Sequence, residues 1–444
     1  MHASSAISGP HPIRPSTIIL FWLPLAATWF MMALEGPYIA AIVARMPATA
    51  HNLAAFGVAT ALAWLIESPI MMLLSAATAL VRDRASYLAL RRFAFILNGL
   101  VTAGMLILSI PAVFRFIGEG LIGLPTEISR LAHLATTILI LWPAAIGYRR
   151  FYQGILVRHH LTRRVAYGTV VRLVTMTVTG GVLLVTASIP GAALGAVALV
   201  TGVIAEAIAS RMMAGHLVSS LMKIDDATAP VLTFPEIARF YYPLALTSIL
   251  SMALGPLVTF GLGRGRAPIE SLAVWPVVQS MIFLFRSGGV AFQEVSIALA
   301  AGHRENEQQV RRTAVWLGVF ASLVLAVVAF TPLEVVWLQR ISGLSPHLAS
   351  YAIWPVRLLV LLPVLEYILS VQRARWILAR RTAPITIATA IEAGGLAVTL
   401  FFALGVFDTV GAIAGALAML LGRAAANGYL YLRASALQFR PPQS

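Results

Sequence analysis

Long apolar runs alternate with short polar segments along the whole chain. A helix needs about 20 mainly apolar residues to cross the hydrocarbon core of a bilayer, and twelve runs reach that length. They lie near residues 16–44, 53–80, 93–113, 131–157, 165–187, 190–217, 235–262, 271–300, 313–333, 349–376, 383–404 and 409–433. The pattern predicts an all-α polytopic membrane protein with twelve transmembrane helices.

The second six runs repeat the first six. Residues 21–45 recur 219 positions later, at 240–264. The punctuating residues that align are Pro24 with Pro243, Gly36 with Gly255, Pro37 with Pro256 and Arg45 with Arg264. After one inserted residue the offset becomes 220, so that Pro143 aligns with Pro363. Doubled modules of this kind are typical of transporters that work by alternating access.

We expect two six-helix bundles joined by a polar linker. The N-terminal bundle covers residues 16–217, the linker 218–234 and the C-terminal bundle 235–434, with tails at 1–15 and 435–444. Because six is an even number, both bundles enter the membrane in the same orientation, and a pseudo-two-fold axis along the membrane normal should relate them. The N-terminal tail has no cleavable signal pattern, so the first helix is expected to be retained.

The composition supports the membrane class and predicts the orientation. Of 444 residues, 59% are hydrophobic and 11% are charged, which leaves too few polar side chains to cover a soluble protein of this length. The net charge of +15 comes from arginines that gather in the loops after even-numbered helices. By the positive-inside rule both termini are cytoplasmic. We expect these arginines to contact anionic headgroups of the cytoplasmic membrane and not nucleic acid.

The sequence carries no signature of an enzyme or of a metal site. It contains no cysteine, which excludes disulfides and thiolate ligands, and no GxxxxGKS or GxxxxGKT phosphate loop. His159, His160 and His303 fall in expected cytoplasmic loops without carboxylates at ligand spacing. We therefore expect no catalysis, no metal and no cofactor, with H⁺ or Na⁺ as the coupling ion.

Several ionisable residues are expected at membrane depth. On insertion scales, an Arg or Asp at the centre of a helix costs at least roughly 2.5–3.5 kcal/mol and needs a partner or water. The candidates are Glu35, Glu67, Arg172, Glu206, Arg286, Glu294, Arg357, Glu366, Glu392 and Arg423. In a membrane protein such residues are candidates for ion coupling, substrate binding or gating.

Two pairs of opposite charge occupy equivalent positions in the repeat. Glu67 corresponds to Arg286, and Arg172 corresponds to Glu392. Charges at equivalent positions can face one another across a central cleft, so Glu67 and Arg286 are predicted to form a gate. The alternative is that each charge is satisfied within its own half by serines, backbone groups or water.

Prolines are expected to kink four of the helices. A proline removes one helix hydrogen bond and clashes with the preceding turn. The residues concerned are Gly36 and Pro37 in helix 1, Gly255 and Pro256 in helix 7, Pro143 in helix 4 and Pro363 in helix 10. Glu35 stands beside the first kink, and Glu67 precedes Pro69 in a similar arrangement. Both glutamates are predicted ion-coupling residues; the alternative for Glu35 is a solvated side chain without a coupling role.

Arginines at membrane depth indicate an anionic substrate. The guanidinium group binds carboxylate or phosphate through two parallel hydrogen bonds. The predicted substrate-binding or gate residues are Arg286, Arg357, Arg172, Glu392 and Arg423. As alternatives, Arg357 can pair with Glu366, and Arg423 can extend toward the cytoplasmic end of its helix.

Four segments resemble those of a known group of transporters: FYYPLAL at 240–246, LAAFGVATAL at 53–62, VRDRA at 81–85 and WPVRLLVLLPV at 354–364. Together with the doubled set of six helices, they resemble the multidrug and toxic compound extrusion (MATE) transporters of the multidrug/oligosaccharidyl-lipid/polysaccharide (MOP) exporter superfamily. Within that superfamily, the sequence is most similar to the progressive ankylosis (ANK) family. The resemblance implies two bundles around a V-shaped cleft and outward movement of organic anions such as pyrophosphate, nucleoside phosphates or citrate. It also implies that Glu35, Arg84 and Arg357 match charged positions of the family.

The sequence predicts a secondary active exporter of a small organic anion or amphipathic compound. It would work as a monomeric antiporter, coupled to a proton or sodium gradient. One alternative is a MOP-type flippase for lipid-linked precursors, although such relatives commonly carry two extra helices for which this chain has no room. Another is a membrane scaffold or receptor that transports nothing.

Overall fold

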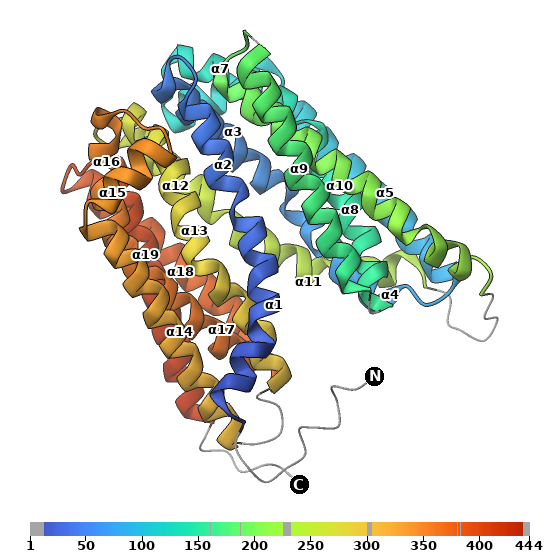
Figure 1. Cartoon of the computed structure of the whole chain (residues 1–444). Coiled ribbons are helices and arrows are strands. Elements are labelled where there is room, and N and C mark those ends of the chain that lie inside the picture. The colour runs from blue at the N-terminus through green and yellow to red at the C-terminus, as the bar shows by residue number, and fades with distance from the viewer. Residues whose placement is uncertain are drawn as a thin grey trace. The chain divides into compact units, whose positions relative to one another are not determined.

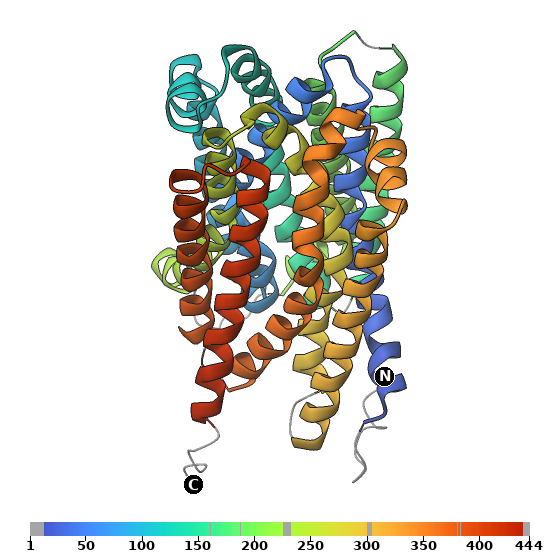
Figure 2. The same ribbon diagram turned by 90° about the vertical axis from the view of Figure 1, so that its left-hand side faces the viewer.

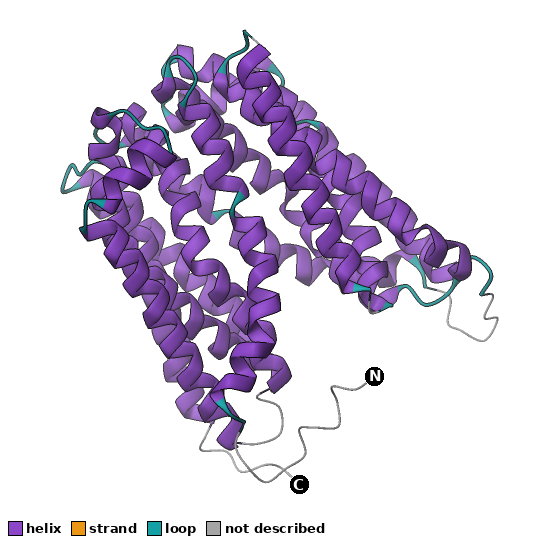
Figure 3. Cartoon of the chain, viewed as in Figure 1, coloured by secondary structure: helices purple, strands orange, loops and turns teal. Residues whose placement is uncertain are grey.

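The polypeptide folds almost entirely into helices. A computed structural model describes residues 13–159, 161–186, 188–224, 232–299, 304–379, 381 and 383–437. Within these ranges no β-strand is present (Figure 3). Twelve helical segments of the described chain are long and apolar enough to cross a membrane, which confirms the predicted all-α polytopic membrane protein. The expected tails and linker lie partly outside the described residues. His160 and His303 lie wholly outside them.

The first half of the chain begins with a helix that is interrupted near its middle. The elements of this half are α1 (Pro15–Ala33), α2 (Glu35–Ala44), α3 (Thr49–Glu67), the 3₁₀ helix η1 (Ser68–Met72), α4 (Leu73–Leu80), α5 (Arg84–Leu108), α6 (Pro111–Arg115), the π-helix η2 (Phe116–Ile122), α7 (Thr126–Ile138), α8 (Leu141–Arg158), α9 (Thr162–Thr186) and α10 (Gly191–Leu221).

The second half follows nearly the same order. Its elements are α11 (Phe234–Met252), α12 (Leu254–Arg264), α13 (Pro268–Leu299), α14 (Arg304–Phe330), α15 (Leu333–Val335), the π-helix η3 (Val336–Ile341), α16 (Pro346–Leu358), the 3₁₀ helix η4 (Leu359–Leu361), α17 (Leu362–Leu378), α18 (Ala383–Gly405) and α19 (Gly411–Leu437). The main difference is that α13 is continuous where the first half has α3, η1 and α4.

Backbone details follow the sequence repeat. Ala48 and Ala267, which are 219 residues apart, adopt the left-handed conformation with φ of 54° and 51°. Gly123 and Gly343, which are 220 residues apart, have φ of 86° and 76°. Because residues other than glycine rarely adopt positive φ, the two alanines are strong evidence that the halves share one backbone path.

Breaks in the helices precede four of the prolines, whereas Pro24, Pro243, Pro276 and Pro355 lie within continuous helices. The break after α1 is at Leu34, three residues before Pro37, and the break after α11 is at Ala253, three residues before Pro256. The break between α7 and α8 precedes Pro143, and η4 immediately precedes the turn that contains Pro363. A proline cannot donate to the turn before it and its ring clashes with that turn, which accounts for the positions of the breaks.

The chain forms two compact units that differ from the bundles expected at 16–217 and 235–434. The N-unit comprises Tyr38–Pro276 with Ser342–Leu348, and the C-unit comprises the rest of the described chain. Consequently α1 belongs to the C-unit, whereas α11 and α12 belong to the N-unit.

Specific contacts hold α1 in the C-unit. Ile18 is fully buried in an apolar core that includes Phe292 and Val295 of α13. The indole N–H of Trp22 donates a hydrogen bond of 2.9 Å to the carbonyl of Gly288. The first helix therefore packs against second-half elements through both apolar and polar contacts.

Equivalent contacts hold α11 and α12 in the N-unit. The hydroxyl of Tyr241 donates to the carbonyl of Pro69 in η1, and its ring lies 5.1 Å from the ring of Phe93 on α5. At the end of α12, Nε of Arg264 donates to the carbonyl of Leu121 in η2 at 2.8 Å. The seventh span thus packs against first-half elements.

The last three long helices of each half pack together. In the N-unit α10 contacts both α8 and α9 (Figure 1). In the C-unit α19 contacts both α17 and α18, and Figure 2 shows α18 and α19, in the red part of the colour scale, side by side. These two groups of three helices hold the ionisable residues described next.

Candidate functional site

A buried carboxylate is surrounded by cationic side chains in the N-unit. Glu206 of α10 is fully inaccessible to solvent. It forms an ion pair with Arg149 of α8, and Nη1 of Arg172 of α9 lies 3.5 Å from its Oε2. The amide of Gln153 donates a hydrogen bond of 3.1 Å to its Oε1. We refer to Glu206, Arg149 and Arg172 as the N-triad.

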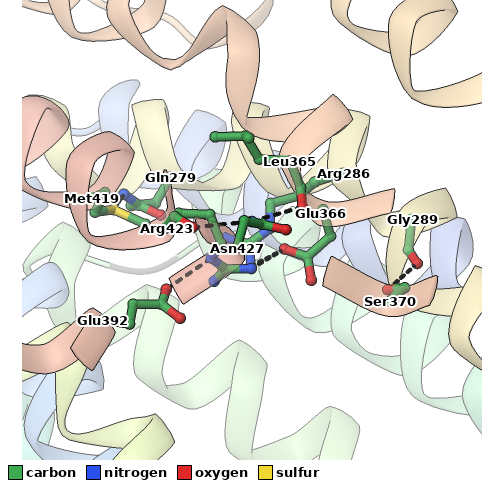
Figure 4. Close-up of polar contacts among 10 residues, drawn as sticks. All are labelled: Gln279, Arg286, Gly289, Leu365, Glu366, Ser370, Glu392, Met419, Arg423 and Asn427. Carbon is green, nitrogen blue, oxygen red and sulfur yellow. Dashed lines mark hydrogen bonds and ion pairs between the residues drawn. The ribbon is translucent and has the colours of Figure 1, made fainter. Parts of the chain in front are cut away.

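A buried guanidinium is surrounded by carboxylates in the C-unit. Nη1 of Arg423 on α19 lies 2.6 Å from Oε2 of Glu366 on α17, and its Nε lies 2.8 Å from Oε1 of Glu392 on α18. Figure 4 shows this guanidinium between the two carboxylates. Glu366 also pairs with Arg286 of α13, at 2.7 Å from Nη2. We refer to Arg423, Glu366 and Glu392 as the C-triad.

Side-chain amides connect the helices that carry the C-triad. The amide of Asn427 donates to the carbonyls of Arg423 at 3.0 Å and Leu365 at 3.2 Å. The amide of Gln372 in turn donates to the carbonyl of Asn427 at 3.2 Å. These bonds tie α17 to α19 beside the ion pairs, so the triad is part of a larger polar network (Figure 4).

The two triads use equivalent helices with the signs of charge exchanged. Arg172 on α9 and Glu392 on α18 are 220 residues apart, so they are equivalent in the repeat. Arg423 and Glu366 each lie three residues before the positions equivalent to Glu206 and Arg149. Three residues are about one helical turn and keep a side chain on the same face. Each half therefore places a single charge on its last helix between two opposite charges on the preceding two.

Glycines allow the close approach of helices that the triads require. A Cβ added at Gly202 of α10 would lie 3.1 Å from the carbonyl oxygen of Arg172. A Cβ added at the equivalent Gly422 of α19 would lie 2.7 Å from the carbonyl oxygen of Glu392. In both units the glycine thus lets the last helix pack directly on the backbone of a triad residue.

Glu67 is buried at the end of α3, where the helix tightens into η1. Its side chain is 4% exposed, and no described residue makes a hydrogen bond to its Oε2. The charged groups that act on it are the guanidinium groups of Arg150 and Arg149 on α8. Of the two predicted ion-coupling residues, Glu67 is therefore the more deeply buried.

Glu35 begins α2 directly after the break in the first span and is partly buried. The following residue, Gly36, approaches α13 so closely that an added Cβ would lie 2.8 Å from Cβ of Ser280. The second glycine at a kink, Gly255, has open space around it. The two kinks are thus alike in sequence and different in packing.

The remaining predicted arginine lies apart from both triads. Nη2 of Arg357 lies 3.1 Å from Oε2 of Glu334, and its Nε donates to the carbonyl of Ala329 at 3.1 Å. Its guanidinium also lies over the rings of Phe330 and Trp354. Arg357 does not pair with Glu366, whose Oε2 is already bound by two other arginines.

Three of the four residues in the two predicted charge pairs have an oppositely charged neighbour within their own unit. Arg286 pairs with Glu366, Arg172 with Glu206 and Glu392 with Arg423. Because Glu67 and Arg286 belong to different units, the gate between them stays a prediction. Glu294, a further candidate from the sequence, is exposed.

Sequence reasoning did not single out Arg149 or Glu334. Arg149 falls near the expected cytoplasmic end of an apolar run, where arginines commonly contact headgroups. The signal that points to it is Glu206, since a carboxylate buried in a helix bundle requires a cationic partner. No group of three or more metal-ligating side chains occurs among the described residues.

Comparison with known proteins identifies the fold. No protein-family model and no curated protein sequence matches the chain. The chain is similar to an inward-facing multidrug resistance MATE family transporter of the MOP superfamily, with a TM-score of 0.72 and 14% identity, covering 95% of this chain and 99% of that one.

Two further structures share this architecture. The lipid II flippase MurJ, in an inward closed conformation, has a TM-score of 0.68 and 15% identity, covering 93% of this chain and 87% of that one. A MOP superfamily transporter from Pyrococcus furiosus has a TM-score of 0.59 and 15% identity, covering 96% and 95% of the two chains. The chain is an integral membrane protein with the fold of MATE transporters of the MOP superfamily.

Proposed function

We propose that the protein is a secondary active transporter that exports a small organic anion or amphipathic compound by alternating access. The driving force would be a proton or sodium gradient across the cytoplasmic membrane. Both termini would lie in the cytoplasm, as the distribution of arginines predicts. The proposal includes the kinship with the ANK family, which rests on the sequence segments alone.

The observation that carries this proposal is the pair of charge-exchanged triads in a transporter fold. Ionisable residues inside a membrane are costly and are found mainly where ions or substrates pass. The six charged side chains of the triads lie at equivalent positions of the two units or one helical turn away from them. A scaffold or receptor would gain nothing from keeping such groups in both halves.

Ion pairs that lie within a single unit also suit a rocking mechanism. Each triad joins three helices of one unit, so each unit can move as a body without breaking its own pairs. Binding of a coupling ion at Glu35 or Glu67 would then bias one state, and it would do so only through a difference in affinity between the states.

Arginine-rich surroundings favour an anionic substrate. Arg286, Arg357, Arg172 and Arg423, with Glu392, remain the proposed substrate-binding or gate residues. A guanidinium already held by a carboxylate can exchange that partner for a substrate carboxylate or phosphate. The Pyrococcus furiosus transporter is described as having a binding pocket of reverse polarity, which suggests a different function for that protein.

A flippase for lipid-linked precursors is the second candidate, because MurJ shares the fold. The present chain covers 87% of MurJ but 99% of the MATE transporter. The chain thus aligns with a larger share of the MATE transporter than of the flippase, and this difference in coverage favours a MATE-like carrier.

Transport into proteoliposomes tests the proposal. Purified protein is reconstituted, a proton or sodium gradient is imposed, and uptake of radiolabelled citrate and nucleotides and of cationic dyes is measured. We expect gradient-dependent flux of at least one compound, lost on dissipating the gradient. Flux of a fluorescent lipid-linked precursor alone would replace the proposal with the flippase function.

A further inference from the structure

An unsatisfied acceptor lies at the helix break that follows α3. Glu67 is 4% exposed, and its Oε2 is buried without a hydrogen bond from any described residue. Burial of a carboxylate oxygen without a donor is unfavourable, and nearly all such groups in native proteins are satisfied. The oxygen is therefore available to a donor that is not part of the polypeptide.

An under-used donor lies beside it. The one hydrogen bond of Arg150 to the described residues joins its Nη2 to the thioether of Met71, at 3.8 Å. A thioether is a weak acceptor, and Nε of Arg150 is buried without a partner among the described residues. Met71 belongs to η1, which begins directly after Glu67, so Arg150 lies against the same helix break, yet no ion pair joins it to Glu67.

Neighbouring groups do not supply the missing partners. The carboxylate of Glu206 is already bound by Arg149, Arg172 and Gln153. Around the two carboxylates of Glu67 and Glu206, α8 and α9 place three arginines. The site consequently has one guanidinium more than its carboxylates neutralise, which is the charge that an anion would balance.

We propose that Arg150 and Glu67 form a binding site for a small oxyanion that carries its own hydrogen-bond donor, such as hydrogen phosphate or a hydroxycarboxylate. The N–H groups of Arg150 donate to the oxyanion, and the O–H group of the ligand donates to Oε2 of Glu67. An oxyanion without a donor meets the carboxylate with like charge and makes no such bond. The site names the substrate class of the proposed transporter and rests on that function.

Matched pairs of anions test this site on the purified full-length protein in detergent. Binding is measured by calorimetry for hydrogen phosphate against sulfate, and for malate against succinate, at constant ionic strength. A site that hydrogen-bonds a ligand O–H rejects the analogue that lacks it, so we expect each donor-bearing anion that binds to do so at least about tenfold more tightly than its partner. The pair that shows binding separates a phosphate ligand from a carboxylate ligand.

Three substitutions assign the two roles. Arg150→Gln should abolish binding, and Glu67→Gln should reduce the preference for the donor-bearing anion to within about threefold. Arg92→Gln removes the same charge from an exposed position on α5 and should leave binding unchanged. If Arg150→Gln does not purify as a single species, Arg150→Lys keeps the charge but lacks the planar donor pair, and should bind at least about tenfold more weakly.

Several outcomes would overturn the site. These are equal binding of both anions of each pair, unchanged binding by the arginine variants, or no binding of any anion by the wild-type protein. The last result leaves the proposed function standing if proteoliposomes still transport a dye. Conversely, a protein that binds phosphate or malate as described and transports nothing keeps the site and loses the transport proposal.

Discussion

Glu206 of α10 and Arg423 of α19 carry opposite charges on the same face of equivalent helices. Arg423 lies three residues, about one helical turn, before the position equivalent to Glu206. Each is held by two side chains of the other sign from the two preceding helices. Duplication alone would give both halves the same charges. Both units thus hold one charge between two opposite charges, and the sign of the central charge differs between them.

The first prediction concerns the glycines beside the triads. Gly422→Ala should destabilise the protein by about 1–3 kcal/mol, because overpacking of a tight helix contact has costs of this size. The added Cβ would lie 2.7 Å from the carbonyl oxygen of Glu392. Gly202→Ala should cost less, since the equivalent distance is 3.1 Å. Thermal unfolding of detergent-purified protein, followed by intrinsic fluorescence, measures both.

The same helix offers a control for this prediction. Gly428 of α19 has no atom within 4 Å of an added Cβ and is exposed, so Gly428→Ala should not lower the melting temperature and should raise it slightly, because alanine favours the helix more than glycine does. If Gly422→Ala were as stable as this control, the result would contradict the close packing of α19 against α18 at Gly422.

The second prediction concerns the packing of α1 in the C-unit. Trp22→Phe keeps an aromatic ring but removes the donor to the carbonyl of Gly288, and should cost about 0.5–1.5 kcal/mol. Trp22→Ala also removes the contacts of its partly buried ring with the core around Ile18 and should destabilise the protein more than Trp22→Phe does. Trp64 is 46% exposed and serves as the matched control. Equal melting temperatures for Trp22→Phe and Trp64→Phe would speak against the hydrogen bond.

The elements of the fold could be predicted from local properties of the sequence. The length of each apolar run defines a span, and the prolines explain why helices break near Leu34 and Ala253. The exchange of α1 and α11 between units could not be predicted, because both halves carry the same apolar pattern. Which copy a helix contacts depends on individual pairs such as Trp22 with Gly288.

The candidate site was predictable only in part. Apolar context is enough to single out Glu206, Glu366 and Arg423 as charges that need partners. The partners themselves follow from helix rotation and crossing, which one-dimensional spacing does not determine. This is why Arg149 was not anticipated and why Arg357 pairs with Glu334 and not with Glu366.

The third prediction separates a gate between Glu67 and Arg286 from pairing within each unit. Because Arg286 already pairs with Glu366, reversing its charge should bring two carboxylates together and lower transport severely. The double variant Glu67→Arg with Arg286→Glu should then transport no better than either single variant. Proteoliposome flux measures all three, normalised to reconstituted protein. Clear recovery of flux in the double variant would establish the gate instead.

The central claim is that each unit is stabilised by one buried charge held between two opposite charges, whichever sign the central charge has. Glu206→Arg alone would place three arginines together, and breaking a buried pair of this kind costs about 3–5 kcal/mol. Adding Arg149→Glu and Arg172→Glu to it reproduces the polarity of the C-triad in the N-unit.

The melting temperatures of the wild type, the single variant and this triple variant test the claim most directly. We expect a large loss of thermal stability for Glu206→Arg and recovery of at least half of it in the triple variant. A triple variant no more stable than the single one, or a single variant as stable as the wild type, would contradict the account.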